Sequence, residues 1–269
     1  MKIYLAKNSG LCFGVKRALD IVDNKKTTVL GKLIHNPQVI ERLSNNGVRF
    51  VDSFSEIYSK EVVISAQGVP ESTITKIKEK SISIIDATCP LVKKVQELAK
   101  QLEKGGYTVV MIGDPKHTEV VGVTKDLKDC LIIKNENEVK KAKDKKIGII
   151  VQTTQDFEKT KKIVEKLKKT ASSFKYYNTI CTPTKSRQAS AIELAKKVQL
   201  MIVVGGYKSA NTKRLAEICS KITKTKHIET AEELKKEWFK DIASVGITAG
   251  ASTPDWIIDK VIKRIKNIA

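Results

Sequence analysis

Three of the five cysteines in this sequence stand where a β-like run of residues gives way to helical spacing. Cys12 lies in "NSGLCFGVKRALD", Cys89 in "SIIDATCPLVKKVQELAK" and Cys181 in "FKYYNTICTPTKSRQASAIELAKKV". A thiolate at the start of a helix is stabilised by the helix dipole and by free backbone N–H groups, which makes it a good metal ligand. Three such thiolates that meet at one point would hold a metal or a cluster and leave one coordination position open.

These cysteines allow three interpretations. Zinc would use the open position for hydrolysis and would need a water-activating base, whereas an iron–sulfur cluster would offer one iron to a substrate. If the thiols stay apart, each is a small apolar side chain in the core. Cys219 shares an apolar helical face with Leu215 and Ile222, and Cys130 begins the apolar run "CLIIK". We therefore predict that Cys130 and Cys219 are structural.

Two more patterns recur between the cysteines, and each places polar side chains after a predicted strand. In the first, an apolar run ends in a glycine-containing polar loop, and a helix follows; the copies are "VLGKLIHN", "VVMIGDPKHTE" and "MIVVGGYKSAN". In the second, a strand also leads through a polar loop into helical spacing; the copies are "VVISAQGVPES", "GIIVQTTQDF" and "VGITAGASTPD". Strands that alternate with helices in this way predict parallel sheets.

The repetition predicts an α/β fold of three units of roughly 90 residues, related by a pseudo-threefold axis. We place the units at residues 1–89, 90–181 and 182–269, with the N-terminal strand free to pack with the last unit. Parallel sheets bind ligands at the carboxyl ends of their strands, where all of these loops begin. The sequence therefore predicts one central site, to which three loops bring cysteines and six bring histidine, serine, threonine, asparagine and glutamate.

The composition narrows the classes of function. The formal net charge of +20 raises nucleic-acid binding as an alternative that rests on charge alone. The basic residues are mostly lysines spread along the polar sides of predicted helices, without a base-stacking aromatic strand, so we expect no nucleic-acid partner. No apolar run approaches the ~20 residues of a membrane span, and the N-terminal apolar stretch is too short for a secretory signal. We expect a cytoplasmic protein with reduced thiols and no membrane partner.

Eight stretches resemble the 4-hydroxy-3-methylbut-2-enyl diphosphate reductase family, iron–sulfur enzymes that complete the non-mevalonate isoprenoid pathway. In family order they are "GLCFGVKRA", "GKLIHNPQVI", "DATCPLVKKV", "HTEVVGV", "VQTTQ", "TICTPTKSRQ", "GGYKSANTKRL" and "GITAGASTPD". The resemblance implies a three-lobed α/β fold around a 4Fe-4S cluster held by Cys12, Cys89 and Cys181. It also implies that the allylic hydroxyl of the substrate binds the open iron and leaves as water, with two electrons and protons, to give isopentenyl diphosphate and dimethylallyl diphosphate.

The resemblance assigns roles to polar residues in the loops. Glu119 in "HTE" matches the family's proton-donating glutamate, and Thr153 matches the threonine that positions the substrate hydroxyl or water. His117 would bind the diphosphate and pass a proton onward. The full set of implied substrate-binding residues is His35, Gln67, His117, Thr153, Ser209, Ala210, Asn211 and Ser252. His227 lies outside every motif, and we predict that it is structural.

Three residues depart from the family pattern. Gln67 in "SAQG" stands where the family has histidine, so it can donate a hydrogen bond to phosphate but cannot add charge or relay a proton. Thr118 replaces the proline of "HPE", which is expected to loosen Glu119, and Ala210 replaces a second serine. A small acidic ferredoxin or flavodoxin is the expected electron donor, because the basic surface would attract it.

Overall fold

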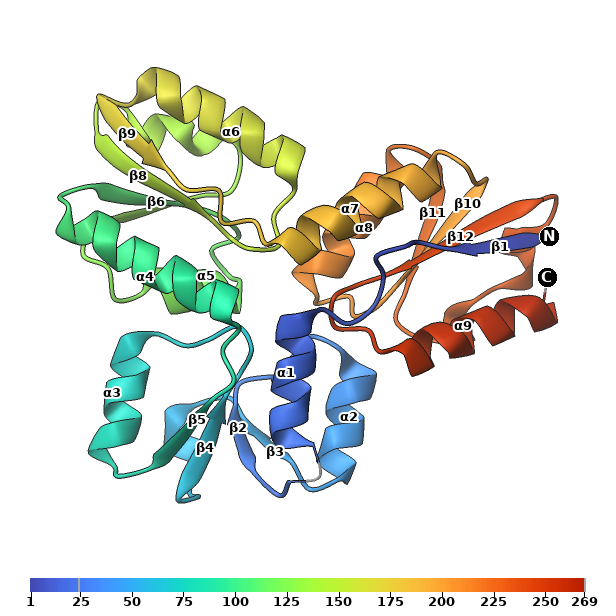
Figure 1. The fold of residues 1–269 in the computed structure, drawn as a ribbon, viewed down its shortest axis with the longest axis horizontal. Coiled ribbons are helices and arrows are strands. Elements are labelled where there is room, and N and C mark those ends of the chain that lie inside the picture. Colours follow the sequence, from blue (N-terminus) through green and yellow to red (C-terminus); the bar gives the residue numbers. More distant parts are fainter. Residues whose placement is uncertain (24, 269) are drawn as a thin grey trace. The chain divides into compact units, whose positions relative to one another are not determined.

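Three sheets of four parallel strands form the framework of the protein in the computed structural model (Figure 1). The structure describes residues 1–23 and 25–268. All three sheets share one strand order, in which the strand that leads to a cysteine lies at an edge. The predicted α/β class, with three similar units and parallel sheets, is therefore confirmed.

The first sheet has the strand order β3 (Arg49–Val51), β2 (Thr28–Leu30), β4 (Glu61–Ile64), β5 (Ser83–Asp86). The helices of this part of the chain are α1 (Phe13–Val22), α2 (Pro37–Asn45) and α3 (Glu71–Glu79). Helix α3 packs beside β5, and its Ile77 joins Val62 and Ile64 of β4 in a buried apolar cluster. The predicted order of strand, polar loop and helix after "VVIS" is confirmed by β4 and α3.

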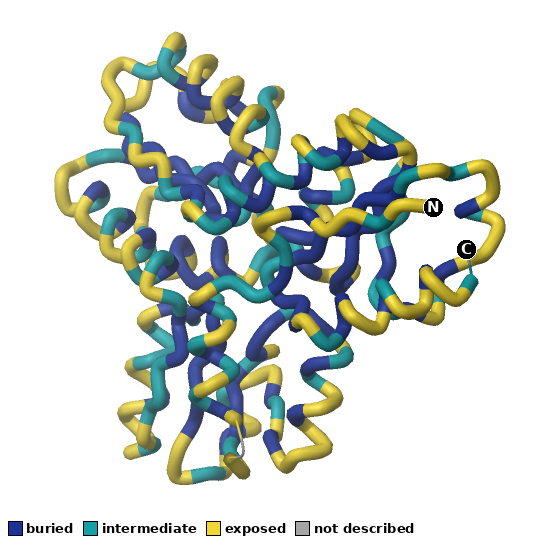
Figure 2. The backbone as a smooth tube through the Cα atoms, turned by 45° about the vertical axis from the view of Figure 1, so that its right-hand side comes forward, coloured by how far each residue is buried: buried dark blue, intermediate teal, exposed yellow. Residues whose placement is uncertain are grey.

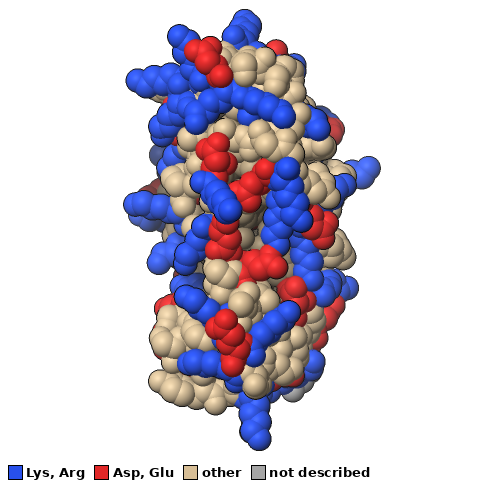
Figure 3. All heavy atoms as spheres, turned by 90° about the vertical axis from the view of Figure 1, so that its left-hand side faces the viewer, with Lys and Arg blue, Asp and Glu red and all other residues tan. Residues whose placement is uncertain are grey.

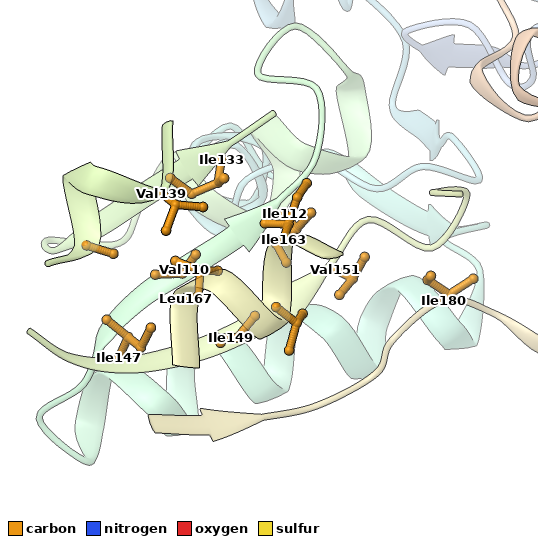
Figure 4. Close-up of a cluster of buried hydrophobic side chains, with 12 residues drawn as sticks. Val110, Ile112, Ile133, Val139, Ile147, Ile149, Val151, Ile163, Leu167 and Ile180 are labelled. Carbon is orange, nitrogen blue, oxygen red and sulfur yellow. The ribbon is translucent and has the colours of Figure 1, made fainter. Parts of the chain in front are cut away.

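The second sheet has the strand order β7 (Cys130–Ile133), β6 (Thr108–Ile112), β8 (Lys146–Val151), β9 (Ser173–Tyr176). Its helices are α4 (Pro90–Lys104), α5 (Thr118–Thr124) and α6 (Phe157–Thr170). The two inner strands are rich in valine and isoleucine and are buried along nearly their whole length, as parallel strands between helices must be. Figure 4 shows Ile163 and Leu167 of α6 pointing into the cluster that Val110, Ile112 and Ile149 form.

The third sheet joins the two ends of the chain. Its strand order is β11 (Lys224–Ile228), β10 (Leu200–Val204), β12 (Ser244–Ala249), β1 (Lys2–Leu5). The N-terminal strand β1 pairs with β12 in the register Lys2↔Ser244 to Leu5↔Ile247. The helices are α7 (Thr182–Ala195), α8 (Ala210–Ser220) and α9 (Asp255–Ile268). Short 3-10 helices in the described residues are Phe54–Glu56, Glu136–Ala142, Ala231–Glu233 and Lys236–Phe239.

Two glycines allow a helix to lie directly on an inner strand. Gly148 is the third residue of β8, and a Cβ there would lie 2.5 Å from a Leu102 methyl of α4. Gly246 is the third residue of β12, and a Cβ there would lie 2.5 Å from the sulfur of Met201 and 2.9 Å from Leu194 of α7. Helices α4 and α7 each follow a cysteine, so these glycines help to set the helices that start at the candidate site.

The chain divides into two compact units. We call residues 1–16, 35–40 and 182–269 the terminal unit, and residues 17–34 and 41–181 the middle unit. The third sheet belongs to the terminal unit, and the first and second sheets belong to the middle unit. Figure 2 shows the inner strands of both units mostly buried, whereas the edge strands β1, β5 and β9 and the outer turns of the helices are largely exposed or partly exposed.

Lysines dominate the exposed helical positions. On the face in Figure 3 the basic side chains are interspersed with carboxylates, which matches the predicted lysine-rich, solvated surface. Among the described residues, no helix is long and apolar enough to cross a membrane.

Candidate functional site

The cysteines of the three strand-to-helix junctions occupy equivalent places. Helices α1, α4 and α7 begin directly after Cys12, Cys89 and Cys181. The backbone N–H of each cysteine donates to the carbonyl oxygen two residues beyond the neighbouring strand: Cys12 to Ala251 (3.1 Å), Cys89 to Ala66 (3.0 Å) and Cys181 to Thr153 (3.0 Å). All three side chains are partly buried. The repeat that was predicted from spacing therefore extends to the hydrogen bonds that hold these residues.

Thiols are the soft ligands that iron–sulfur clusters and zinc both use. Cys12 belongs to the terminal unit, and Cys89 and Cys181 belong to the middle unit. Within either unit, the described residues contain no group of three histidine, cysteine, aspartate or glutamate side chains that could hold a metal ion by itself. The thiol donors at these equivalent junctions have the chemistry that an iron–sulfur cluster needs from its protein ligands.

The other two cysteines have a different environment. Cys219 is fully buried beside Leu215 in an apolar cluster, and Cys130 begins β7 at the edge of another. Burial raises the pKa of both thiols to about 12, and nearby Asp129 and Glu103 add to the shift at Cys130. Such thiols remain protonated at neutral pH and are poor metal ligands, as expected for structural cysteines.

Glu119 and Thr153 form a buried pair in the middle unit. Glu119 lies in the first turn of α5 and is 2% exposed. One carboxylate oxygen accepts from the backbone N–H of Thr153 at 2.7 Å, and the other accepts from the Thr153 hydroxyl at 2.7 Å. Burial raises the pKa of Glu119 to about 7, and the two hydrogen bonds from Thr153 oppose that rise only in part. The carboxyl group can therefore hold or release a proton near neutral pH.

His117 and Gln67 lie in the same unit. His117 is the residue before α5, and its Nδ1 accepts from the backbone N–H of Glu119 at 3.2 Å, so it caps the helix that carries the acid. The side-chain oxygen of Gln67 is buried and has no hydrogen-bond partner in the described residues. Thr118 is the first residue of α5, and Glu119 beside it is held at both oxygens. Thr153, which follows β8, thus holds the carboxylate from a distant part of the chain, and the loosening of Glu119 by Thr118 stays a prediction.

The terminal unit contains the remaining predicted residues. The Ser252 hydroxyl donates to the backbone carbonyl of His35 at 3.2 Å. Asn211 is 4% exposed, and its side-chain oxygen accepts from the backbone N–H of Ala251 at 3.0 Å. Ala251 also accepts from the Cys12 N–H, so Asn211, Ser252 and Cys12 are neighbours around one loop.

The start of α8 carries two more of the predicted residues. Ser209 caps α8 by accepting from the backbone N–H of Thr212 at 3.3 Å, and Ala210 is the first residue of that helix. Serine is a favoured residue at this position because its oxygen satisfies a free N–H of the first turn. The unit thus presents neutral donors and a helix start, which suit phosphate oxygens.

His227, predicted to be structural, supports the loop that carries Ser209. Its Nε2 lies 2.8 Å from the carbonyl oxygen of Gly205, and its ring centroid lies 4.7 Å from that of Tyr207. The Tyr207 hydroxyl bonds to the Glu233 carboxylate and to the His227 carbonyl. Burial lowers the pKa of His227, so the ring is neutral at pH 7. The cluster anchors the loop to β11 and the segment after it.

Two arginines close in sequence to the cysteines received no role in the sequence analysis. Arg17 of α1 donates to the carbonyls of Asp86 and Thr88, and Arg187 of α7 donates to the carbonyl of Gly10. Both lie within the quoted motifs "GLCFGVKRA" and "TICTPTKSRQ". Their type was a usable signal, because arginine is rare in this chain, but their partners are distant in sequence and could not be named from it.

Two named relatives match the sequence over the whole chain. A relative from Geobacter metallireducens named 4-hydroxy-3-methylbut-2-enyl diphosphate reductase is 44% identical, over 100% of this chain and 98% of that protein. A relative of the same name from Pelobacter propionicus is 45% identical, over 100% of this chain and 99% of that protein.

Two solved structures agree as well. A structure of the E-1-hydroxy-2-methyl-but-2-enyl-4-diphosphate reductase from Plasmodium falciparum matches with a TM-score of 0.92 and 28% identity, over 97% of this chain and 87% of that chain. The second is a structure of (E)-4-hydroxy-3-methyl-but-2-enyl diphosphate reductase, described as the terminal enzyme of the non-mevalonate pathway. It matches with a TM-score of 0.69 and 40% identity, over 100% of this chain and 100% of that chain. The family model described as "LytB protein" matches residues 3–266. With equivalent cysteine junctions in all three sheets and relatives of this identity over its whole length, the chain belongs to the LytB protein family.

Proposed function

We propose that this enzyme removes the hydroxyl group of (E)-4-hydroxy-3-methylbut-2-enyl diphosphate reductively and forms isopentenyl diphosphate and dimethylallyl diphosphate. Its full-length relatives carry the name of this reductase. The single observation that carries the assignment at the site is the buried Glu119–Thr153 pair, because reductive loss of a hydroxyl group as water consumes protons. A carboxyl group with a pKa of about 7 is suited to supply them.

Cys12, Cys89 and Cys181 are the proposed ligands of a 4Fe-4S cluster. The proposal is supported by their thiol chemistry, their partial exposure and their equivalent backbone anchoring. When bound, such a cluster supplies electrons and a Lewis-acidic iron toward the substrate oxygen. The chain's own part is to hold the three cysteine loops still, which the hydrogen bonds from each cysteine N–H accomplish.

Glu119 is the proposed proton source. The Thr153 N–H and hydroxyl hold its two oxygens in one orientation, so a proton released from this group leaves from a fixed position. His117 caps the same helix turn and is the proposed next member of a proton path. In this proposal the Thr153 oxygen also accepts a hydrogen bond from the substrate hydroxyl, since its own proton is donated to Glu119.

The residues proposed to bind the diphosphate mostly have neutral side chains. They are His35, Gln67, His117, Ser209, Ala210, Asn211 and Ser252. Support comes from their places in loops that follow strand ends and from the starts of α5 and α8, where free backbone N–H groups favour anions. Ala210 contributes a backbone N–H but no side-chain donor, so this position is expected to bind less tightly than a serine would.

The electron donor is proposed to be a small acidic protein such as a ferredoxin or a flavodoxin. The net charge of +20 supports this, because opposite charge speeds the encounter of two proteins. The cytoplasm is the proposed compartment, since cysteine ligands must stay reduced before a cluster is inserted.

The test is anaerobic purification, reconstitution with iron and sulfide, and product analysis with a chemical reductant. We expect about four iron and four sulfide per chain, a brown colour with absorbance at about 400 nm, and formation of both isomers. Cys12→Ser, Cys89→Ser and Cys181→Ser should each remove both the cluster and the activity. The matched control Cys219→Ser should keep both.

The alternative is a zinc hydrolase that uses the same cysteines. It predicts a colourless protein that binds one zinc, needs no reductant and does not remove the hydroxyl group. Turnover with zinc alone, or full activity in any of the three serine variants, would overturn the assignment.

A further inference from the structure

We infer that Arg17 and Arg187 are positioning residues, which fix the loops that carry Cys89 and Cys12 for cluster binding. The inference rests on the proposed function and adds to it two residues that touch neither cluster nor substrate. Each arginine lies on a helix that begins at one cysteine and grips the backbone just before a different cysteine.

The choice of residue type is the first support. The chain has 50 basic residues, and only six of them are arginines: Arg17, Arg42, Arg49, Arg187, Arg214 and Arg264. Two of the six lie five and six residues after a candidate ligand, at Arg17 after Cys12 and Arg187 after Cys181. A rigid guanidinium can bind two backbone carbonyls at once, which a lysine ammonium on a flexible stem does poorly.

Arg17 completes the backbone hydrogen bonding of the loop before Cys89. Its two terminal nitrogens donate to the carbonyls of Asp86 at 3.1 Å and Thr88 at 3.3 Å. The N–H groups of this loop donate elsewhere: that of Thr88 to the Asp86 carboxylate at 2.9 Å and that of Cys89 to Ala66 at 3.0 Å. Loss of the guanidinium would leave two carbonyls of a tight loop without this donor, which favours a different loop conformation.

Arg187 plays the corresponding part before Cys12. It is 4% exposed, which is rare for an arginine and costly unless its charge is satisfied. Its guanidinium donates to the Gly10 carbonyl at 2.7 Å and to the Pro183 carbonyl of its own helix at 3.1 Å. Gly10 has a φ of +80°, a conformation that L side chains rarely adopt, so the loop turns sharply at the gripped residue.

The third cysteine loop is held in another way and serves as an internal reference. Before Cys181, the Thr179 hydroxyl bonds to the backbone carbonyl of Val151 and accepts from its N–H at 2.8 Å. The Asn178 side chain accepts from the Ile180 N–H at 3.3 Å. Helix α4, which begins after Cys89, has no arginine at the equivalent positions. Five and six residues after Cys89 it has Lys94 and Val95. Removal of Arg17 should therefore leave the Cys181 loop unchanged.

The first experiment measures thiol exposure in the full-length chain without added iron. Wild type, Arg17→Gln, Arg17→Lys, Arg187→Gln and Arg187→Lys are pulsed with iodoacetamide, and alkylation is quantified for each cysteine peptide. We expect Arg17→Gln to raise the rate at Cys89 by about tenfold and to leave Cys181 unchanged. Arg187→Gln should raise the rate at Cys12 by about tenfold and leave Cys89 unchanged, with each lysine variant in between.

The second experiment measures cluster retention in the reconstituted protein. Iron release to a chelator is followed for the same variants and for two matched controls, Arg42→Gln and Arg264→Gln, whose side chains are exposed. Faster release from the Arg17 and Arg187 variants alone supports the inference. Rates equal to those of the controls overturn it, and so does an equal rise in alkylation at all five cysteines, which would indicate general unfolding.

The two experiments separate this inference from the proposed function. If wild type fails to assemble an iron–sulfur cluster, the proposed function fails, and the alkylation pattern still decides whether the arginines fix these loops. If wild type assembles the cluster and the arginine variants match the controls in both assays, the inference alone is overturned.

Discussion

Glu119 in the middle unit and Asn211 in the terminal unit occupy equivalent positions, each as the second residue of a helix that follows an inner strand of its sheet. Each lies seven residues after the end of a strand, β6 for Glu119 and β10 for Asn211. Each accepts a hydrogen bond from the backbone N–H two residues after the end of the neighbouring strand, from Thr153 at 2.7 Å and from Ala251 at 3.0 Å. The repeat therefore supplies the same backbone N–H donor in both units. Its acceptor is a carboxyl group in the middle unit and an amide in the terminal unit.

The chemistry of the two places differs for physical reasons. A buried carboxyl group has to lose hydration to ionise, and its pKa rises to about 7 although two groups of Thr153 donate to it. A buried amide carries no charge at any pH and keeps its hydrogen bond throughout. The middle unit thereby provides a proton that can be exchanged at neutral pH, and the terminal unit provides a pH-independent contact beside Ser252 and Cys12.

In the first sheet the same donor is used differently again. The N–H of Ala66, two residues after β4, donates to the backbone carbonyl of Leu33 at 3.3 Å. The residue seven places after β2 is Pro37, which begins α2 and offers no side-chain acceptor. The equivalent backbone N–H thus donates to an acid, an amide and a main-chain carbonyl in the three sheets, and only the acid can take part in proton transfer.

Glu119→Gln makes the middle unit resemble the terminal unit and should have the largest effect. The amide keeps an acceptor for the Thr153 N–H but has no exchangeable acid. We expect turnover to fall by at least about 100-fold, with substrate binding within about tenfold and the cluster retained. Anaerobic turnover and a binding titration followed by cluster spectroscopy measure this. Near-normal turnover would move the proton source to His117, and loss of the cluster would make Glu119 structural.

The same variant should change the pH dependence of stability. Because the pKa of Glu119 is raised from 4.5 to about 7 on folding, the folded state holds its proton more tightly, and wild type loses stability as pH rises from 4.5 to 7. The loss relative to Glu119→Gln should be roughly 3 kcal/mol. Urea unfolding of both proteins at pH 5 and pH 8 measures it. Equal pH dependence in the two proteins would contradict the raised pKa.

Thr153→Ala makes residue 153 resemble Ala251, and its effect should be smaller. The Thr153 hydroxyl lowers the pKa of Glu119, so its removal should raise that pKa above about 7. The alkaline limb of the activity profile should move to higher pH, and turnover at pH 7 should fall by about 20-fold through lost positioning. Thr153→Ser is the matched control and should restore both. A profile that stays in place would separate Thr153 from the titration of Glu119.

Much of this framework could be predicted from the sequence because it depends on local periodicity. The runs "VVMI" and "MIVV" alternate with helical spacing, so the parallel strands and the helices after them followed from residue pattern alone. The cysteine junctions followed as well, since a helix begins directly after each of Cys12, Cys89 and Cys181.

The partners of the site residues were not accessible in the same way. Arg17 meets Asp86 and Thr88 across about 70 residues of chain, and Arg187 meets Gly10 across a longer stretch. Such contacts depend on how sheets and helices pack, which periodicity does not encode. The restraint on Glu119 is of the same kind, because it comes from Thr153, which follows the end of a different strand.

Asn211→Asp is the reciprocal change and should act on binding more than on turnover. An aspartate can keep the bond from the Ala251 N–H, but its negative charge would repel the diphosphate of the proposed substrate. We expect KM to rise by about tenfold at pH 8 and by less at pH 5, where more of the aspartate is protonated. Steady-state kinetics at both pH values measure this, with iron content as the control for the neighbouring Cys12 loop. A KM equal to that of wild type at both pH values would show that residue 211 does not face the diphosphate.

Gln67→Met should have the smallest effect, with opposite signs for stability and for binding. The side-chain oxygen of Gln67 is buried without a hydrogen-bond partner in the described residues, which costs free energy in the ligand-free protein. Methionine has nearly the same size and no such group, so unfolding free energy should rise by about 1 kcal/mol. The amide is also a proposed diphosphate contact, so KM should rise by about threefold while turnover stays unchanged. Urea unfolding and steady-state kinetics on one preparation test both signs. A less stable Gln67→Met protein with an unchanged KM would make Gln67 a packing residue, and polar contacts in the middle unit would then reduce to His117, Glu119 and Thr153.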